Sequence, residues 1–410
     1  MKKKLKLFCL MAFILSSIIS AFSIYQVTNE TRLKEQEALD VIANLAHVQA
    51  SKLSKSLIAI QPMISSLAED IYSSNLSIDD IDQRLKQDLG DNQWMFGFGV
   101  ALEPCRLMDK PLEPCSLGDE RLWSRYYISG DDGIIKSADI DYDYTSFEHD
   151  WYRKPMLYGK SWNEPYFGEA SNTFLVEFGE PFWLPGKDRT LDAPDGLIFA
   201  SLSINKVKQL IQFDHDLISY YQVVSKQGLF VVHPTKNDVL SGKTIFEQAW
   251  KQDDAALNSM AVRAVAGGNG TIYHVDPATE IGSWMIYVPI VEPNWSLIVV
   301  VDKERLLIQD DMRQHWYVVI LQLVVSVLLL VAFSVLQWST PPHPHLLLIS
   351  MGVSVIVFFA GVCLWKINDE YRAKAHSDEL RLINKSVLDR FKNNQLRLSE
   401  DQYIDEPKFV

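Results

Sequence analysis

The architecture of this chain is most visible in a stretch that reads Asp150-Trp151-Tyr152-Arg153-Lys154-Pro155, followed by Glu164-Pro165-Tyr166-Phe167. These residues combine large aromatic faces with polar edges, which is typical of sites that hold a small molecule by stacking and a few hydrogen bonds. They lie within a long segment, residues 26–315, that has an apolar run at each end. The pattern predicts a folded, ligand-binding domain held between membrane spans.

Three apolar runs contain no Asp, Glu, Lys or Arg: Leu7 to Tyr25, Trp316 to Leu336 and Leu346 to Trp365. Each has about the ~20 residues that a helix needs to cross ~30 Å of hydrocarbon. The basic residues between Met1 and Lys6 predict a cytoplasmic N-terminus. A cleaved signal peptide ending near Ala21-Phe22-Ser23 is the alternative for the first run. In either case we expect residues 26–315 outside the cytoplasm.

Composition and cysteine placement exclude several classes of protein. The 410 residues are 48% hydrophobic, which excludes a mainly disordered chain, and the net charge of −13 offers no basic face for nucleic acid. Cys105 and Cys115 bracket a short loop outside the cytoplasm, where an oxidising compartment favours a disulfide, although two free thiols are the alternative. His149 lies between two acidic residues without metal-binding spacing, so we expect no metal site and no cofactor.

The pattern of apolar residues and turns predicts an α+β fold with a long N-terminal helix, two tandem antiparallel-sheet lobes and three transmembrane helices. Apolar residues from Val41 to Ile71 recur at helical spacing, with a bend expected at Pro62. Strands are expected over Asn172 to Phe182 and Gly196 to Ile204, and helices over Ile245 to Val265 and Asp302 to His315. The expected segments are residues 1–26 (basic end and first transmembrane helix), 27–90 (stalk helix), 91–215 (membrane-distal lobe), 216–308 (membrane-proximal lobe), 309–337 (connecting and second transmembrane helix), 338–345 (short loop), 346–365 (third transmembrane helix) and 366–410 (helical tail).

A set of motifs in fixed order carries a family resemblance. In the first lobe these are Gly97 to Pro104, Asp150-Trp151-Tyr152, and Trp162 to Phe167; in the second they are Gly228 to Pro234 and Tyr287 to Ile290. Together they resemble the double Cache sensor domains of bacterial transmembrane receptors, which are PAS-like in fold. The resemblance covers about residues 30 to 308 and implies a ligand pocket in the membrane-distal lobe, with the proximal lobe coupling it to the membrane.

Within this family, the resemblance also bears on the ligand. The amino-acid-binding subgroup carries aromatic residues where this chain has Tyr144, Trp151 and Tyr166, but its Arg and two Asp are replaced here by His149, Gly168 and Ser201. An amino acid would lose its charge-assisted partners, so we expect a small molecule that is not a typical amino-acid ligand. The candidate ligand-binding residues are Tyr144, His149, Trp151, Tyr152, Arg153, Tyr166, Glu169 and Ser201.

The leading functional hypothesis is a multi-pass receptor of the bacterial inner membrane whose periplasmic domain binds a solute and signals across lipid. The expected partners are a second copy of the chain and a cytoplasmic signalling protein, because no output-enzyme signature occurs in these residues. We expect residues 366–410 to begin a second external region, in a fragment of a longer receptor or in a subunit. The alternatives are a membrane-anchored periplasmic enzyme using Glu164 or Glu169 as acid and base, and a ligand-free interaction domain.

Overall fold

The computed structural model describes residues 2–74, 76–104, 122–130, 133–275 and 281–307, together with short helical stretches between residues 317 and 331. Two compact units are present, one formed by Leu33–Gln309 and the other by Met1–Arg32 with Asp310–Val410. The expected disulfide between Cys105 and Cys115, the third apolar run and the tail lie outside the described residues. Part of the second run lies outside them too.

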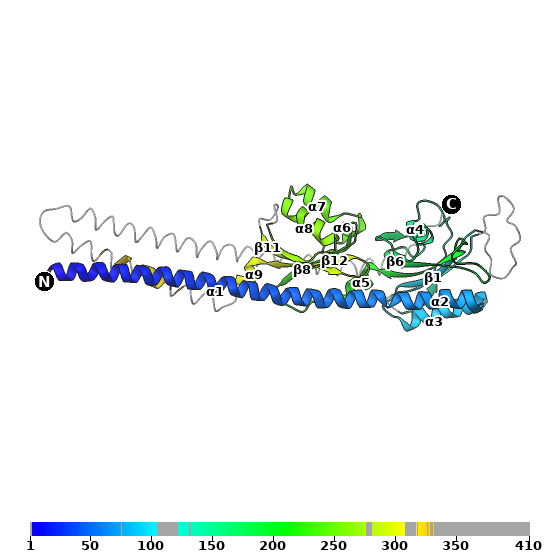
Figure 1. The fold of residues 1–410 in the computed structure, drawn as a ribbon, viewed down its shortest axis with the longest axis horizontal. Helices are drawn as coiled ribbons and strands as arrows, with labels where there is room; N and C mark the ends of the chain where they lie inside the picture. The colour runs from blue at the N-terminus through cyan, green and yellow to red at the C-terminus, as the bar shows by residue number, and fades with distance from the viewer. Residues whose placement is uncertain are drawn as a thin grey trace, which may run out of the picture. The chain divides into compact units, whose positions relative to one another are not determined.

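The N-terminal region forms three helices, α1 (Lys2–Ile58), α2 (Ile60–Ser74) and α3 (Ile78–Asp91) (Figure 1). The long N-terminal helix is therefore confirmed, but the expected stalk to residue 90 is interrupted twice. Pro62 cannot donate to the carbonyl of Ile58, the residue at which α1 ends. The second interruption precedes α3, where Ser77 and Asp80 form a capping box that satisfies the first free backbone donors of the helix.

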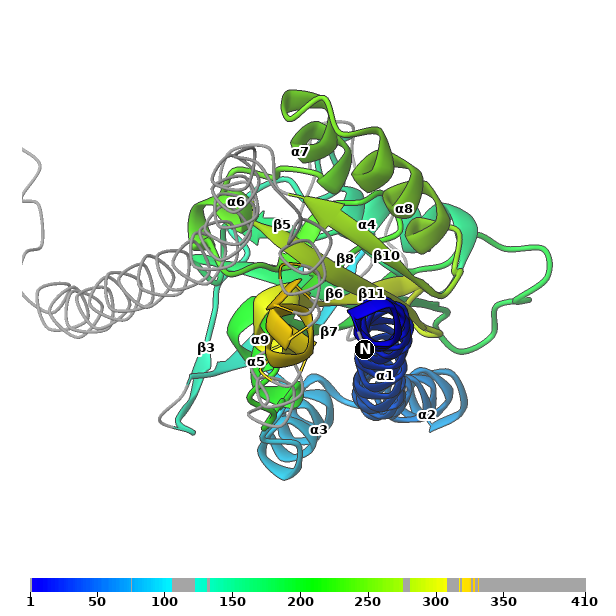
Figure 2. The same ribbon diagram turned by 90° about the vertical axis from the view of Figure 1, so that its left-hand side faces the viewer.

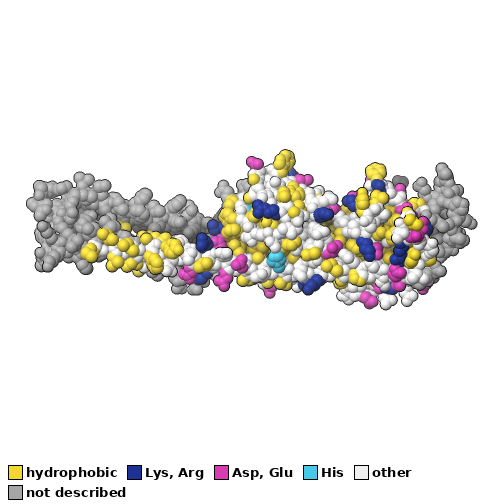
Figure 3. Space-filling view, in the orientation of Figure 1, with side chains coloured by type: hydrophobic (Ala, Val, Ile, Leu, Met, Phe, Trp, Pro, Cys, Tyr) yellow, Lys and Arg dark blue, Asp and Glu magenta, His cyan; other side chains and the backbone are white. Residues whose placement is uncertain are grey.

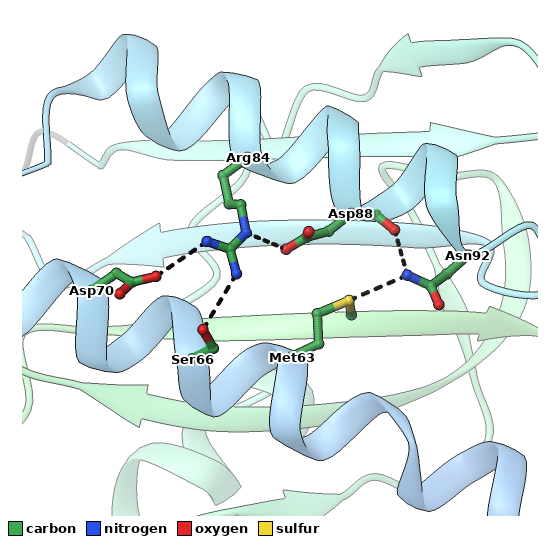
Figure 4. Close-up of polar contacts among 6 residues, drawn as sticks. All are labelled: Met63, Ser66, Asp70, Arg84, Asp88 and Asn92. Carbon is green, nitrogen blue, oxygen red and sulfur yellow. Dashed lines mark hydrogen bonds and ion pairs between the residues drawn. The ribbon is translucent and has the colours of Figure 1, made fainter.

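Arg84 of α3 ties the two short helices together (Figure 4). Its Nη1 lies 3.1 Å from the carboxylate of Asp70 on α2, and its Nε lies 2.8 Å from Asp88 on α3. A third guanidinium nitrogen, Nη2, donates to Ser66 at 3.3 Å. The planar fork of Arg suits this arrangement, since it presents several donors in fixed directions. The helix pair therefore has a polar clasp as well as its apolar interface.

The first lobe, expected to be membrane-distal and called the distal lobe below, is a seven-stranded antiparallel sheet with the order β3-β2-β1-β7-β6-β4, in which β5 also pairs with β6. Its strands are β1 (Gly97–Leu102), β2 (Ser124–Ser129), β3 (Ile135–Ser137), β4 (Ser161–Trp162), β5 (Tyr166–Gly168), β6 (Thr173–Phe182) and β7 (Gly196–Ser203). Side chains alternate between the faces. Val176, Phe178 and Ile198 join the core cluster that contains α2 and α3, whereas Leu197 and Phe199 face the opposite side.

The second lobe, expected to be membrane-proximal and called the proximal lobe below, is a five-stranded antiparallel sheet with the order β10-β11-β12-β8-β9. Its elements are α5 (Ile204–Leu210), β8 (Ile218–Val224), β9 (Phe230–Val232), α6 (Lys236–Leu240), α7 (Ile245–Lys251), α8 (Ala255–Val265), β10 (Gly270–Val275), β11 (Gly282–Ile290), β12 (Trp295–Asp302) and α9 (Lys303–Leu307). Helices α7 and α8 cover one face and α1 lies along the other (Figure 2). The two predicted antiparallel lobes are thus confirmed.

The helix α1 contacts the proximal lobe with polar as well as apolar groups. Trp284 Nε1 donates to Glu35 at 2.7 Å, and the backbone amide of Glu292 donates to Ser54 at 3.1 Å. Further along, Gln212 on the chain between the lobes donates to Gln49 at 3.3 Å. Buried side chains of α1 such as Leu53 and those of both sheets belong to one apolar cluster. The helix therefore acts as a shared spine for both lobes.

Apolar side chains are exposed on the early part of α1, where Figure 3 shows them gathered on one surface. Met11, Leu15, Phe22 and Tyr25 are each more than half exposed. Across the described residues, however, no helix combines the length and the apolarity that crossing a membrane requires. The three transmembrane helices expected from the sequence therefore stay predictions.

Candidate ligand-binding site

Helix α4 (Asp150–Tyr158) covers the face of the distal sheet that lies opposite α2 and α3 (Figure 1). Trp151 and Tyr152 on its inner side are buried, with 3% and 1% of their surface exposed. Close contact with the sheet depends on Gly179, because a Cβ there would lie 2.7 Å from the Pro155 ring of α4. The helix is thus seated directly on β6.

Aromatic rings from α4 and three strands enclose a small cavity. The centroids of Trp151 and Phe199 are 4.9 Å apart, and those of Phe199 and Tyr126 are 5.2 Å apart. Gly99 of β1 leaves room for this packing, since a Cβ would approach the Phe199 ring to 2.5 Å. The cavity is lined by Tyr126, Ile140, Tyr142, Trp151, Tyr166, Gly168, Ala170, Ser171, Leu175, Glu177 and Phe199. Its volume of ≈ 10 Å³ is about that needed for one water molecule.

Glu177 of β6 is the charged group of this cavity. Only 2% of its surface is exposed, and its carboxylate accepts hydrogen bonds from the hydroxyls of Tyr166 and Ser201. Ser201 in turn accepts a hydrogen bond of 3.1 Å from Tyr126. Burial raises the pKa of Glu177 to about 7, although the two hydroxyl donors oppose the shift. The carboxyl can therefore exchange a proton near neutral pH.

The tyrosine hydroxyls around Glu177 stay protonated. Burial raises the pKa of Tyr126, Tyr142 and Tyr166 above its ordinary value, and the nearby Glu177 carboxylate adds to each shift. The hydroxyls consequently act as hydrogen-bond donors and acceptors rather than as bases. The indole Nε1 of Trp151 is buried, and its interaction with the Tyr142 hydroxyl opposes part of the rise in the pKa of that tyrosine without reaching normal hydrogen-bond geometry, so this donor can turn to a bound molecule.

The structure separates the eight candidate residues into three groups. Trp151 and Tyr166 line the cavity, and Ser201 lies directly behind it through its bond to Glu177. Tyr144 and Tyr152 are buried beside it but use their hydroxyls within the lobe, Tyr144 on the carbonyl of Leu102 at 2.6 Å and Tyr152 on Glu103 at 2.8 Å. His149, Arg153 and Glu169 are not among the cavity-lining residues.

The environment of those three residues is also clear. His149 precedes α4 and its ring lies 4.6 Å from that of Tyr142, so it backs one wall of the cavity. Arg153 is partly exposed on α4, and Glu169 is exposed in the turn after β5. Among the described residues, no group of three or more His, Cys, Asp and Glu side chains is arranged to hold a metal ion. The ligand-binding role of all eight residues stays a prediction.

Most cavity-lining residues were not predicted from the sequence, among them the aromatic residues Tyr126, Tyr142 and Phe199 and the acidic Glu177. Glu177 carries the clearest signal, because it is a charged residue in the middle of a mainly apolar strand and occupies a position that alternation assigns to the interior. Tyr126 and Phe199 lie in strands whose alternation predicts burial, but not that a void remains beside them. Tyr142 lies outside the helices and strands, so no periodicity marks it.

A short segment joins the cavity to the proximal lobe. Asn163 donates from its backbone amide to the Glu177 carbonyl at 2.8 Å and from its side chain to the Trp151 carbonyl at 3.1 Å. Its neighbour Trp162 lies against Trp295 of β12, with ring centroids 6.3 Å apart. Burial raises the pKa of the next residue, Glu164, while a hydrogen bond with Ser225 of the proximal lobe lowers it. Contiguous contacts therefore join the cavity wall to β12.

Comparisons with known proteins agree with this geometry. Residues 81–187 match the family of the first PDC sensor domain of methyl-accepting chemotaxis protein-like proteins, a range that includes Trp151, Tyr166 and Glu177. None of the curated protein sequences matches the chain.

Solved structures show the same fold. The extracellular domain of the putative histidine kinase mmHK1S-Z3 is 21% identical, with a TM-score of 0.51 over 67% of this chain and 96% of that one. The corresponding domain of the putative histidine kinase mmHK1S-Z2 is also 21% identical, with a TM-score of 0.51 over 66% and 99%. The periplasmic sensory domain of the Campylobacter jejuni chemoreceptor Tlp1 is 16% identical, with a TM-score of 0.46 over 66% and 96%. The family match over residues 81–187, together with the two structures whose TM-score is 0.51, confirms the resemblance of the chain to the double Cache sensor domains of bacterial receptors.

Proposed function

We propose that the chain is the sensor part of a bacterial receptor, which binds a small solute in the cavity of its membrane-distal lobe. The observation that carries this proposal is the cavity itself, in which aromatic rings surround a buried carboxyl group and a weakly engaged indole donor. Sites of this composition hold small molecules by apolar contact with a few oriented polar groups. The match to a chemotaxis sensor family over this lobe supports the same interpretation.

Signalling would use the segment that carries Trp162 and Asn163. A solute that enlarges the cavity displaces Trp151 or Glu177, and both are bonded to Asn163. The displacement would reach Trp295 through Trp162 and bias the arrangement of the proximal lobe. A solute shifts such an equilibrium only by its differential affinity for the two arrangements.

Membrane attachment completes the proposal. The apolar runs Leu7 to Tyr25, Trp316 to Leu336 and Leu346 to Trp365 would anchor the protein in the inner membrane, with both lobes in the periplasm. A homodimer, surrounding lipid and a cytoplasmic signalling partner belong to the same proposal, as do the segment boundaries expected from the sequence. The enzyme alternative has less support, since Glu169 is exposed and Glu164 is not among the cavity-lining residues.

The test is a thermal-shift screen of the purified full chain against organic acids, polyamines, sugars and nucleobases. We expect at least one solute to raise the Tm in a saturable manner. Trp151→Phe removes this indole donor, so it should weaken that solute by about tenfold, the cost of roughly one hydrogen bond. The matched control Trp250→Phe alters an indole on α7 that is 82% exposed and should change nothing. A screen without any saturable shift, or a shift that ignores Trp151, would contradict the proposal.

A further inference from the structure

The wall of the cavity has an unusual chemical composition. Five of its lining residues are aromatic, namely Tyr126, Tyr142, Trp151, Tyr166 and Phe199, and one is a carboxylic acid. Among the described residues that line it there is no Lys or Arg. The faces of aromatic rings carry negative charge density and attract cations, so rings and carboxylate act in the same direction.

Glu177 has hydrogen-bond donors but no charged partner in this wall. Its two donors, Tyr166 and Ser201, are neutral hydroxyls, and no ion pair joins it to a described residue. A buried carboxylate without a counter-charge is costly, and an opposite charge brought close to it recovers part of that cost. Burial accordingly raises the pKa of Glu177 to about 7, because the two hydroxyl donors do not replace all the stabilisation that water gives the ionised carboxylate.

The same wall disfavours other solutes of this size. An anion would meet a like charge without any basic residue in the described lining. A neutral polyol needs many hydrogen-bond partners, whereas the Tyr166 and Ser201 hydroxyls already donate to Glu177. A protonated amine brings donors to an acceptor and a positive charge to a negative one.

We propose that the solute is a small organic cation, a protonated or methylated amine, whose charged group binds the Glu177 carboxylate between the aromatic rings of this cavity. The inference rests on the proposed sensor function and names the chemical class of its ligand. The present volume of ≈ 10 Å³ admits about one water molecule, so an amine enters only if part of the wall moves. Two parts of the wall lie outside the strands and α4, namely the turn that carries Ala170 and Ser171 and the segment that carries Ile140 and Tyr142, and these are the parts that would yield.

Three probes of nearly equal size separate the classes: n-propylamine as cation, n-propanol as neutral molecule and propionate as anion, with tetramethylammonium as a methylated cation. Each is titrated into the purified full chain at pH 8, with the Tm and the heat of binding as readouts. We expect saturable binding of one or both cations only. Glu177→Gln, which keeps the side-chain size, should weaken it by at least about tenfold, because one buried charge pair is lost.

Glu180→Gln is the matched control. Glu180 lies on the same strand, three residues further on and therefore on the opposite face, where it contacts Lys160 at 2.8 Å and Ser65 at 2.6 Å. It should leave amine binding unchanged. Binding of propionate or propanol in place of the amines, lost in Trp151→Phe, would overturn the inference while the sensor function stands. Failure of every solute, including those of the wider screen, would remove both.

A pH titration of the wild-type chain covers the case in which Glu177→Gln does not fold. The other titratable groups facing Glu177 are Tyr126, Tyr142 and Tyr166, and burial raises the pKa of each, so they stay neutral through this range. Only the ionised Glu177 attracts a cation, and amine affinity should therefore fall by up to about tenfold per pH unit below about pH 7. An affinity that stays constant from pH 8 to pH 5.5 would overturn the inference.

Discussion

Glu177 and Ser201 are direct neighbours across β6 and β7, and the Ser201 hydroxyl donates a hydrogen bond to the Glu177 carboxylate. The family resemblance places an acidic residue at position 201 in amino-acid receptors, where this chain has serine. The structure puts a carboxylate one strand away, facing the same cavity. This chain therefore has an acidic side chain at the same cavity, but β6 carries it instead of β7.

The first prediction concerns stability against pH. Because the folded pKa of Glu177 is about 7 and its ordinary value is 4.5, the folded protein holds a proton between these pH values that the unfolded chain has lost. The contribution of Glu177 to the free energy of unfolding therefore decreases as the pH rises from 4.5 to 7 and stays constant above pH 7. The loss is at most about 3 kcal/mol. Urea denaturation of wild type and Glu177→Gln from pH 5 to pH 8 should show the difference between them growing in favour of the variant, whereas parallel curves would contradict the assignment.

The second prediction separates the hydroxyls around Glu177. Tyr166→Phe removes a direct donor to the carboxylate, so it should raise the pKa of Glu177 further and cost about 1–3 kcal/mol at pH 8. Tyr126→Phe is the matched control, because Tyr126 donates to Ser201 and not to the carboxylate. Tyr126→Phe should lower the free energy of unfolding by less than Tyr166→Phe does, and its effect should depend less on pH. Equal effects of the two variants in urea denaturation would argue against a direct bond from Tyr166.

The third prediction tests how α4 is seated. Gly179→Ala places a Cβ 2.7 Å from Pro155 Cγ, so α4 must shift and the lobe should lose about 1–3 kcal/mol. Gly90→Ala is the control in the same lobe, since the nearest atom to its Cβ would lie at an ordinary 3.6 Å. It lies within α3 and should be neutral or stabilising by up to about 1 kcal/mol. Thermal denaturation distinguishes the two, and a harmless Gly179→Ala would mean that α4 is not held against β6.

The fourth prediction concerns the clasp between α2 and α3. Arg84→Ala removes contacts to Asp70, Asp88 and Ser66, but 34% of its side chain is exposed and solvent weakens the ion pairs. We expect a loss of about 1 kcal/mol that shrinks in high salt. Lys55→Ala, at an exposed position in the last turn of α1, is the control and should have no measurable effect. A loss for Arg84→Ala that does not respond to salt would point to packing of its aliphatic stem instead.

The strands of both lobes were largely predictable because their physical signals are local. The run Asn172 to Phe182 predicted β6, which covers Thr173–Phe182, and Gly196 to Ile204 predicted β7, which ends one residue earlier. Alternation and flanking turn residues determine such elements without help from the rest of the fold. The same holds for β11 and β12.

Helix boundaries were harder to predict wherever a local break interrupts the periodicity. One helix was expected over Ile245 to Val265, but α7 and α8 are separate because Asp253 adopts a positive φ of 52° and Asp254 caps α8. The apolar spacing is similar on both sides of the break, so periodicity does not reveal it. The helix expected over Asp302 to His315 begins as α9, and residues 308–315 lie outside the described part of the chain.

The candidate site was only partly predictable from sequence, for a different reason. Trp151 and Tyr166 were expected from their residue types and line the cavity. Tyr144 is also an aromatic residue with a hydroxyl, but that hydroxyl donates to the backbone carbonyls of Leu102 and Trp123. Whether a ring borders a void or fills one depends on neighbours from distant strands, which no local pattern encodes.

Strand β6 separates the cavity from α2, and each of its two faces carries one carboxylate. Glu177 belongs to one side, and on the other Glu180 accepts a hydrogen bond of 2.6 Å from Ser65 of α2. Thermodynamic reciprocity links the two sides of the strand. If solute binding changes the stability of the Glu180–Ser65 hydrogen bond by some factor, then a change in that bond must alter the solute affinity by the same factor. Because Glu180→Gln is expected to leave amine binding unchanged, an occupied pocket must in turn leave this contact with α2 unchanged, and its effect is expected to pass through Trp162 to β12 instead.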